Sequence, residues 1–221
     1  MTYTHILWDW NGTLVDDVDL CVRTTNNLLA RRGRQPIGRE QYLRQFTFPV
    51  TQFYQAIGFD FAREDYMQMA DEWIAEYRGG FAAMSRLNGP VHEALDGVAA
   101  LGLPQSILSA CETRLLHASI EHMGLSGRFT KIFGTGDNAA HGKGELARQV
   151  AGGGHFDPAS TVLFGDTEHD AEVARDAGID CVLIAKGHQH PERLRATGHE
   201  VLDCISQVPG WLQQRRSARH H

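Results

Sequence analysis

Long apolar runs and paired cysteines are both missing from the sequence. No stretch approaches the ~20 consecutive apolar residues that a membrane-spanning helix needs, and the N-terminal segment MTYTHILWDW lacks the basic region and cleavage site of a signal peptide. We therefore expect a cytoplasmic protein without a membrane partner. The cysteines form no Cys-x-x-Cys pair, which favours reduced thiols over zinc ligands or a disulfide framework; they are Cys21, Cys111, Cys181 and Cys204.

Positive charge is also scarce. The chain has 21 lysine and arginine residues against 27 acidic residues, which gives a formal net charge of −6 and a pI near 6.0. A nucleic-acid-binding protein usually presents a basic face, so no nucleic-acid partner is expected. The length of 221 residues, with 42% hydrophobic and 22% charged residues, suits one globular domain or one domain with a smaller insert.

Short apolar segments alternate with amphipathic ones along most of the chain. The apolar segments predict buried strands at His5–Trp8, Gln105–Ser109, Lys131–Thr135, Thr161–Phe164 and Cys181–Ala185. The amphipathic segments predict helices at Thr113–His122, Gly144–Ala151 and Ala171–Ala177, with Gly178 ending the last of them. Gly, Ser or Asp follows most of the strands, as at the open carboxyl edge of a parallel sheet. The pattern predicts an α/β fold with a Rossmann-like, mostly parallel sheet.

Residues 17–89 are the exception, because they show helical periodicity and no convincing second strand. Roughly 70 residues are too many for a simple connection, so we expect a small all-helical cap domain here and a core domain made of residues 1–16 and 90–221. Helices are predicted at Asp17–Arg32, Arg39–Phe46, Val50–Ile57 and Arg63–Ala83. The aromatic residues of this insert are expected to form its own core and no ligand pocket; they are Phe46, Phe48, Phe53, Tyr54, Trp73, Tyr77 and Phe81. The polar tail, residues 208–221, is expected to be frayed.

The first candidate motif starts at Asp9, at the end of the first strand. Asp9 and Asn11 precede a Gly12-Thr13 turn, whose backbone N–H groups can cradle phosphate oxygens. The alternative is an ordinary strand-end aspartate in a glycine turn.

Two further candidates follow later strands. Ser109 ends a predicted strand, and its hydroxyl together with the N–H of Ala110 can hold a phosphoryl oxygen; the alternative is a helix N-cap for the segment from Cys111. Lys143 is one of only three lysines and lies in a glycine-flanked loop before a helix. Its ammonium group can screen the repulsion between a carboxylate and a phosphate, whereas the alternative is an ordinary exposed lysine.

The strongest candidate is Gly165-Asp166 followed by Asp170. A helix that begins near Thr167 brings both carboxylates to one side of the turn, where they repel unless a cation lies between them. Such hard oxygen ligands suit magnesium. The alternative is a pair of solvated acids at a helix start. His169 is expected to face solvent.

The order of these motifs resembles the four-motif series of the haloacid dehalogenase superfamily. The series is Asp-x-x-Gly-Thr, strand-Ser, Gly-Lys and strand-Gly-Asp-x-x-x-Asp, and the resemblance extends over essentially the whole chain. The helical insert resembles the superfamily's α-helical cap. Residues 165–178, GDTEHDAEVARDAG, resemble the phosphoglycolate-phosphatase-like branch.

The resemblance implies a role for each candidate residue. Asp9 is then the nucleophile that forms an aspartyl-phosphate, and Mg²⁺ is bound by Asp9, the backbone carbonyl of Asn11 and Asp166. Asp170 orients metal-bound water or Lys143. Ser109 and Lys143 hold the transferring group, and Gly12 and Thr13 complete the phosphate cradle. The implied activity is Mg-dependent hydrolysis of a small phosphorylated metabolite by a monomer or homodimer.

Asn11 departs from the family's pattern, which has a second aspartate there as general acid and base. An amide cannot exchange a proton as a carboxyl group does, and losing such a group costs ~10²–10⁴-fold in rate. Turnover is therefore expected to be slow or limited to good leaving groups, unless another residue supplies the proton. The alternative is an impaired protein that binds a phospho-ligand or partner. Deamidation at Asn11-Gly12 would restore an aspartate. Substrate-facing cap residues are guessed to be Arg44, Gln45, Thr47 and Thr51.

Overall fold

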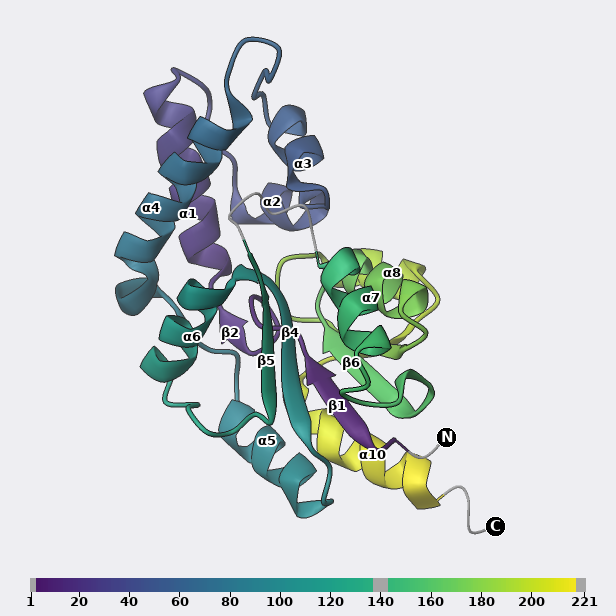
Figure 1. Ribbon diagram of the computed structural model, residues 1–221. Coiled ribbons are helices and arrows are strands. Elements are labelled where there is room, and N and C mark those ends of the chain that lie inside the picture. The colour runs from purple at the N-terminus through teal and green to yellow at the C-terminus, as the bar shows by residue number, and fades with distance from the viewer. Residues whose placement is uncertain (1–2, 137–142, 218–221) are drawn as a thin grey trace.

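A six-stranded parallel sheet forms the centre of the computed structural model, which describes residues 3–136 and 143–217 (Figure 1). The strand order is β5-β4-β1-β6-β7-β8, and every neighbouring pair is parallel. Their bounds are β1 His5–Trp8, β4 Gln105–Glu112, β5 Lys131–Thr135, β6 Thr161–Gly165, β7 Asp180–Ile184 and β8 Glu200–Leu202. The strand order reverses at β1, which lies between β4 and β6.

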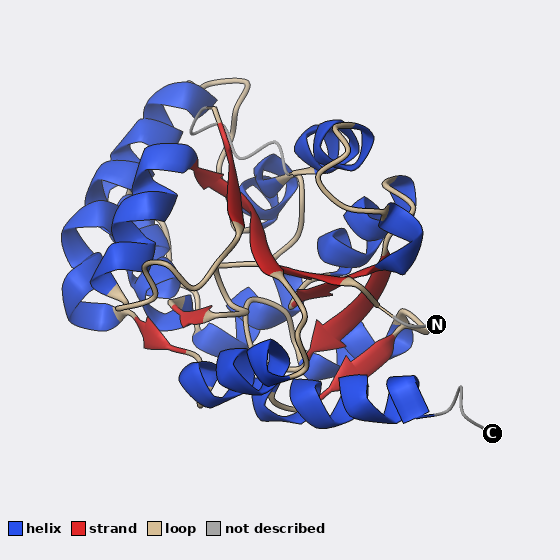
Figure 2. Cartoon of the chain, turned by 60° about the horizontal axis from the view of Figure 1, so that its bottom comes forward, coloured by secondary structure: helices blue, strands red, loops and turns tan. Residues whose placement is uncertain are grey.

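Helices cover both faces of the sheet (Figure 2). Successive side chains of a strand point to opposite faces, so Ile6 and Trp8 pack in one core and Leu7 in another. The first core also contains residues of α5 (Val91–Ala100), α6 (Thr113–His122) and α10 (Val208–Ser217). The second contains residues of α7 (Gly144–Gly152) and α8 (Glu168–Asp176). The remaining short elements are α9 (Pro191–Ala196) and the 3₁₀ turns Pro158–Ser160 and Ile205–Gln207.

Four helices lie between β2 (Val15–Asp16) and β3 (Arg86–Leu87), which pair antiparallel with each other. They are α1 Val18–Arg31, α2 Arg39–Gln45, α3 Val50–Ala56 and α4 Tyr66–Met84. Figure 1 shows them beyond the carboxyl end of β1, with α1 beside α4. The carboxylate of Asp65 caps α4 by accepting a hydrogen bond from the N–H of Gln68. This helical layer therefore faces the edge of the sheet where a ligand site is expected.

The predicted fold class is confirmed, and the predicted strands and helices lie within a few residues of the observed ones. The statement that residues 17–89 contain no strand was wrong, because β3 lies there; two residues are too few to produce a sequence pattern. The strands β2 and β8 and the helices α5, α9 and α10 were also missed. All four cysteines are free. Within the described ranges, no helix has the length and apolarity that crossing a membrane requires.

The expectation of a frayed tail was wrong for residues 208–217, which form α10. Its Trp211 is buried, stacks on Tyr3 with ring centroids 5.6 Å apart and meets the edge of Phe164 at 5.7 Å. Trp211, with the buried Val208 and Leu212, thus holds α10 against the core. Residues 218–221 lie outside the described part of the chain.

Replacing Trp211 by alanine should therefore lower the free energy of unfolding by about 3–5 kcal/mol, the usual cost of removing a buried tryptophan. Urea denaturation measures this change. The control is Gln213→Ala on the exposed face of the same helix, which should change stability by less than ~0.5 kcal/mol. Equal, small effects of the two substitutions would show that α10 does not contribute to the core.

Candidate active site

The site forms at the carboxyl edge of the sheet, where the strand order reverses. Asp9 follows β1, Asp166 follows β6, and Ser109 lies within the neighbouring strand β4. In open α/β sheets, ligands bind at this reversal point because the connections diverge there and leave a crevice. The strand topology thus brings together side chains that are far apart in the sequence.

Lys143 is the central cation of this group. Its side chain is 2% exposed, and its Nζ contacts a carboxylate oxygen of Asp9, lies 2.6 Å from Oδ1 of Asp170 and donates to the backbone oxygen of Leu108 at 3.0 Å. Burial acts to lower the pKa of Lys143, but Asp170 and Asp9 raise it above its ordinary value, so the ammonium stays charged. The alternative of an exposed lysine is excluded. Gly142, which precedes Lys143, lies outside the described residues.

Asp170 is held by several donors at the start of α8. Its Oδ2 accepts hydrogen bonds from the backbone N–H of Thr167 at 2.9 Å and from its hydroxyl at 2.6 Å, and Thr167 in turn caps the helix. Burial acts to raise the pKa of Asp170, but the Lys143 ammonium lowers it below its ordinary value. A side chain at Gly165 would lie 2.3 Å from Cγ of Asp170, so the glycine allows this close packing. Asp170 therefore fixes Lys143 in place.

Asp166 is completely buried beside the turn that follows Asp9. Its Oδ1 accepts from the hydroxyl of Thr13 at 2.9 Å, and its Oδ2 accepts from the N–H of His188 at 2.6 Å. A Cβ at Gly12, whose φ is +81°, would lie 2.2 Å from Oδ2. Gly12 and Thr13 thus lie against Asp166, and neither is among the cavity-lining residues.

The three carboxylates together carry more negative charge than the surrounding protein neutralises. Ligand oxygens of Asp9, Asp166 and Asp170 lie within 4.8 Å of one another, and the contacting cation is Lys143. Burial raises the pKa of Asp166 well above its ordinary value and that of Asp9 as well, despite the Lys143 ammonium. Hard oxygen ligands with surplus negative charge fit a divalent cation, which would remove this penalty.

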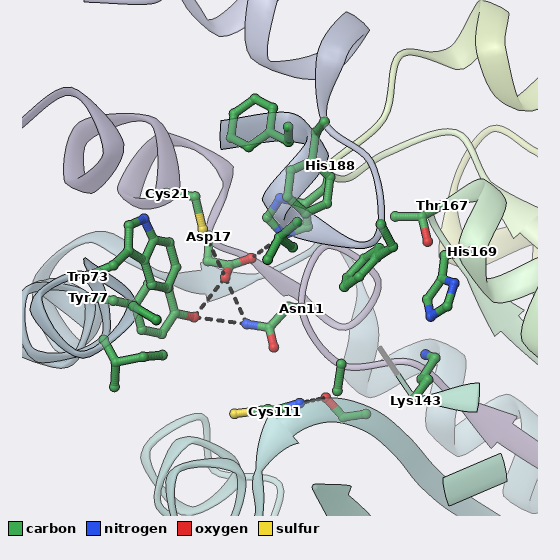
Figure 3. A pocket seen from close by; sticks show the side chains of 18 of the residues that line it. Asn11, Asp17, Cys21, Trp73, Tyr77, Cys111, Lys143, Thr167, His169 and His188 are labelled. Atoms are coloured by element: carbon green, nitrogen blue, oxygen red, sulfur yellow. Dashed lines mark hydrogen bonds and ion pairs between the residues drawn. The ribbon is translucent and has the colours of Figure 1, made fainter. Parts of the chain in front are cut away.

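Asn11 is fixed by a hydrogen-bond network that sequence reasoning missed. Its Nδ2 donates to Oδ2 of Asp17 at 2.8 Å and to the hydroxyl of Tyr77 at 2.8 Å, while Tyr77 donates to Asp17 at 2.7 Å (Figure 3). The amide oxygen points away from these partners. The N–H of Gly12 donates to Asp17 and to the backbone oxygen of Val15, which opposes its attack on the amide and so disfavours deamidation.

His188 completes this network from the loop after β7. Its Nε2 lies 3.1 Å from Oδ1 of Asp17, and its Nδ1 lies 2.9 Å from the hydroxyl of Tyr42. Burial acts to lower the pKa of His188, but the Asp17 charge raises it to about 9, so the pair is ionic at neutral pH. Two features of the sequence could have indicated this pair: Asp17 directly follows Asp16, and Gly187-His188 follows the predicted strand Cys181–Ala185.

The chain matches the family model described as haloacid dehalogenase-like hydrolase over residues 6–184. The chain belongs to this family. The expected resemblance to its phosphatases is confirmed, and with it the expectation of an enzyme of the phosphoric monoester hydrolase class.

Curated relatives and solved structures agree with this membership. An N-acetylmuramic acid 6-phosphate phosphatase of Pseudomonas aeruginosa is 24% identical over 199 residues, which cover 87% of this chain and 86% of the relative. A phosphoglycolate phosphatase of Rhodobacter capsulatus is 25% identical, with 83% and 85% covered. A haloacid dehalogenase-like protein from Streptococcus pneumoniae superposes with a TM-score of 0.80 at 18% identity, covering 95% of this chain and 98% of the other, which supports the fold.

A cavity of about 170 Å³ extends from the carboxylate group of this hydrolase into the helical insert. Ser109 and Ala110 line it from β4. Ser109 is buried and accepts from the N–H of Cys111, but the helix begins at Thr113 with Glu112 as its cap, so the N-cap alternative was wrong. The hydroxyl and the strand edge thus remain available to a phosphoryl group.

Three expectations about the cavity wall were wrong. His169 does not face solvent: it lines the cavity and stacks on Phe48 with centroids 4.5 Å apart. Six of the seven listed aromatic residues line the cavity as well as packing in the insert; Phe81 does not. The guessed residues do not line it, because apolar neighbours in the same bend turn inward instead; the guesses were Arg44, Gln45, Thr47 and Thr51.

The His188–Asp17 pair should make stability depend on pH. The folded pKa of His188, about 9, lies above the ordinary 6.5, so its contribution is fully present below about pH 6.5 and is lost as the pH rises through about 9. We expect the free energy of unfolding to fall by about 1–3 kcal/mol across this window. Urea denaturation at several pH values measures it. His188→Gln should lack the fall, whereas the exposed control His92→Gln should keep it. A fall retained in His188→Gln would refute this source of pH dependence.

Proposed function

We propose that this hydrolase is a Mg²⁺-dependent phosphomonoesterase that acts on a small phosphorylated metabolite through a phosphorylated Asp9. The observation that carries the proposal is the position of Asp9. Asp9 lines the cavity, and its carboxylate contacts the buried ammonium of Lys143. Its ligand oxygen lies within 4.8 Å of that of Asp166, close enough for both to bind one cation. A nucleophile, a fixed cation and a cation-binding carboxylate in one crevice suit phosphoryl transfer.

The chain's own residues perform most of the chemistry. A carboxylate oxygen of Asp9 attacks phosphorus, the bond to the leaving oxygen breaks, and the electron pair departs with that oxygen. Lys143, together with Ser109 and the N–H of Ala110, would hold the transferring group. Water then hydrolyses the aspartyl-phosphate and regenerates Asp9. Because the ammonium is fixed before the substrate binds, little reorganisation is needed in the transition state.

Mg²⁺ would be held by Asp9, Asp166 and the backbone carbonyl of Asn11, and would neutralise charge on the phosphoryl oxygens. Asp170 belongs to the same carboxylate group and contacts Lys143. The carboxylates fit this ion because they are oxygen ligands with an unneutralised charge. Asp170 is largely occupied by Lys143 and Thr167, so we assign it to positioning.

Because residue 11 is an asparagine, turnover is expected to be slow. The Nδ2 of Asn11 is committed to Asp17 and Tyr77, and an amide supplies no proton to a leaving oxygen. The same observation favours the alternative, a protein that binds a phospho-ligand or partner without turnover. The two functions differ in a single measurable property, the release of phosphate.

Phosphate release from p-nitrophenyl phosphate should require Mg²⁺ and should disappear in Asp9→Asn, because the amide cannot attack phosphorus. A phosphate assay with and without a chelator measures both effects. Asp16→Asn is the matched control, because Asp16 pairs with Arg86 and does not line the cavity. Activity that survives in Asp9→Asn would exclude Asp9 as the nucleophile. No release by the wild type in Mg²⁺ would favour the binding function.

Exchanging the two partners, Asn11→Asp with Asp17→Asn, should raise kcat/KM for an alkyl phosphate by ~10²–10⁴-fold, because it supplies the missing acid and keeps the hydrogen bond between the two side chains. Asn11→Asp alone should gain less, since it places two carboxylates in contact. Asp17→Asn alone is the control and should show no gain. An unchanged rate in the double variant would show that more than the acid is missing.

A further inference from the structure

We propose that the substrate is a small aryl phosphate, that is, the phosphate monoester of a phenol whose ring carries no charged group. This inference rests on the proposed function and names the leaving group. It comes from two independent observations, the aromatic wall of the cavity and the amide at position 11.

The part of the cavity beyond Asp9 is built from aromatic rings of the insert. Tyr42 meets Phe53 edge-on at 5.3 Å, and Trp73 stacks on Tyr77 at 5.0 Å, both pairs lining the cavity. Figure 3 shows the Tyr77 hydroxyl joined to Asn11 and Trp73 next to Tyr77. An apolar cavity of about 150 Å³ holds one benzene ring. The whole cavity, including the space beside Asp9 and Lys143, measures about 170 Å³, so the leaving group can be no larger than about one ring.

The charges along the wall argue against an anionic leaving group such as glycolate. No arginine lines the cavity among the described residues, and its cations Lys143 and His188 are already paired with carboxylates. The acidic Glu112 and Asp17 also line it. A carboxylate on the leaving group would therefore be buried without a partner, which is strongly unfavourable.

A cationic leaving group such as choline is also disfavoured, although aromatic rings can bind a quaternary ammonium. The carboxylate of Asp17 is matched by His188, and that of Glu112 accepts the backbone N–H groups of Arg114 and Leu115 at 3.0 Å. Glu112 also lies 3.5 Å from the guanidinium of Arg78. Apart from the three carboxylates of the proposed Mg²⁺ site, the wall thus offers no unmatched anion to a cation. An uncharged ring fits it best.

The amide at position 11 selects the same class for a chemical reason. Without a general acid, the leaving oxygen departs as an anion. A phenol has a pKa of about 10, whereas an alcohol lies near that of water, about 15.7, so the phenolate is the better leaving group by roughly five to six pKa units. If about half of this difference is expressed in the transition state, the gain of ~10³-fold offsets the ~10²–10⁴-fold lost with the acid.

The oxygen of Asp9 bonds to phosphorus while the aryl oxygen leaves with the electron pair of the P–O bond and takes a proton from solvent. Water then releases phosphate and restores the carboxylate of Asp9. Since Asn11 cannot activate this water, the second step is slow and common to all substrates. The leaving group therefore affects kcat/KM more than kcat.

The test compares phenyl phosphate with cyclohexyl phosphate, which have rings of similar size but leaving groups of different pKa. In the wild type with Mg²⁺, kcat/KM for the phenyl ester should exceed that for the cyclohexyl ester at least ~10²-fold. In the double variant Asn11→Asp with Asp17→Asn, the ratio should shrink at least tenfold. Equal rates for the two esters in the wild type would overturn the proposal.

Charge selectivity is tested with 2-phosphoglycolate and phosphocholine, both of which should be poorer substrates than phenyl phosphate. A preference for either one would overturn this inference while p-nitrophenyl phosphate hydrolysis still supported the proposed function. No hydrolysis of any ester, p-nitrophenyl phosphate included, would refute the proposed function itself.

The aromatic wall is tested with Trp73→Leu, which should raise KM for phenyl phosphate severalfold with kcat nearly unchanged. Phe81→Leu is the matched control: Phe81 is a buried aromatic residue of the same helix, α4, but it does not line the cavity, so its KM should stay at the wild-type value. Equal KM values in the two variants would show that the aromatic wall does not bind the leaving group.

Discussion

The contact of the Lys143 ammonium with Asp9 and Asp170 is the interaction on which the rest of the site depends. Buried carboxylates repel one another, and removing one partner of a buried ion pair leaves an uncompensated charge that costs several kcal/mol, typically about 3–5. The sequence meets this constraint by placing Lys143 at the start of α7 and Asp170 in the first turn of α8, helices that pack on the same face of the sheet. The ammonium thus positions the nucleophile before any ligand arrives.

The network around Asn11 links the helical insert to the sheet. Asp17 lies at the start of α1, Tyr77 on α4 and His188 in the loop after β7, and all three meet within hydrogen-bonding distance. The amide donates to the Asp17 carboxylate, whereas an unprotonated aspartate at position 11 would repel it. Asn11 and Asp17 therefore form a matched pair.

Sequence patterns predicted the polar groups at strand ends, because parallel strands bring their carboxyl ends to one edge whatever the side-chain detail. Asp9, Ser109 and Asp166 were found in this way, whereas Lys143 was found from its glycine-flanked loop before a helix. The patterns did not predict the Asp17–His188 pair, whose members lie 171 residues apart and meet only through the tertiary fold. They also could not show that Phe53 packs in the insert and lines the cavity at once, since an apolar ring looks the same in both settings.

The central claim is that a carboxylate oxygen of Asp9 receives the phosphoryl group. The direct measurement is an acid quench of the wild type during turnover of phenyl phosphate, followed by peptide mass spectrometry. The account predicts one added phosphoryl group on the peptide that contains Asp9, accumulating because Asn11 cannot activate the hydrolytic water. Sustained phosphate release with no phosphorylated Asp9 at any quench time would contradict it.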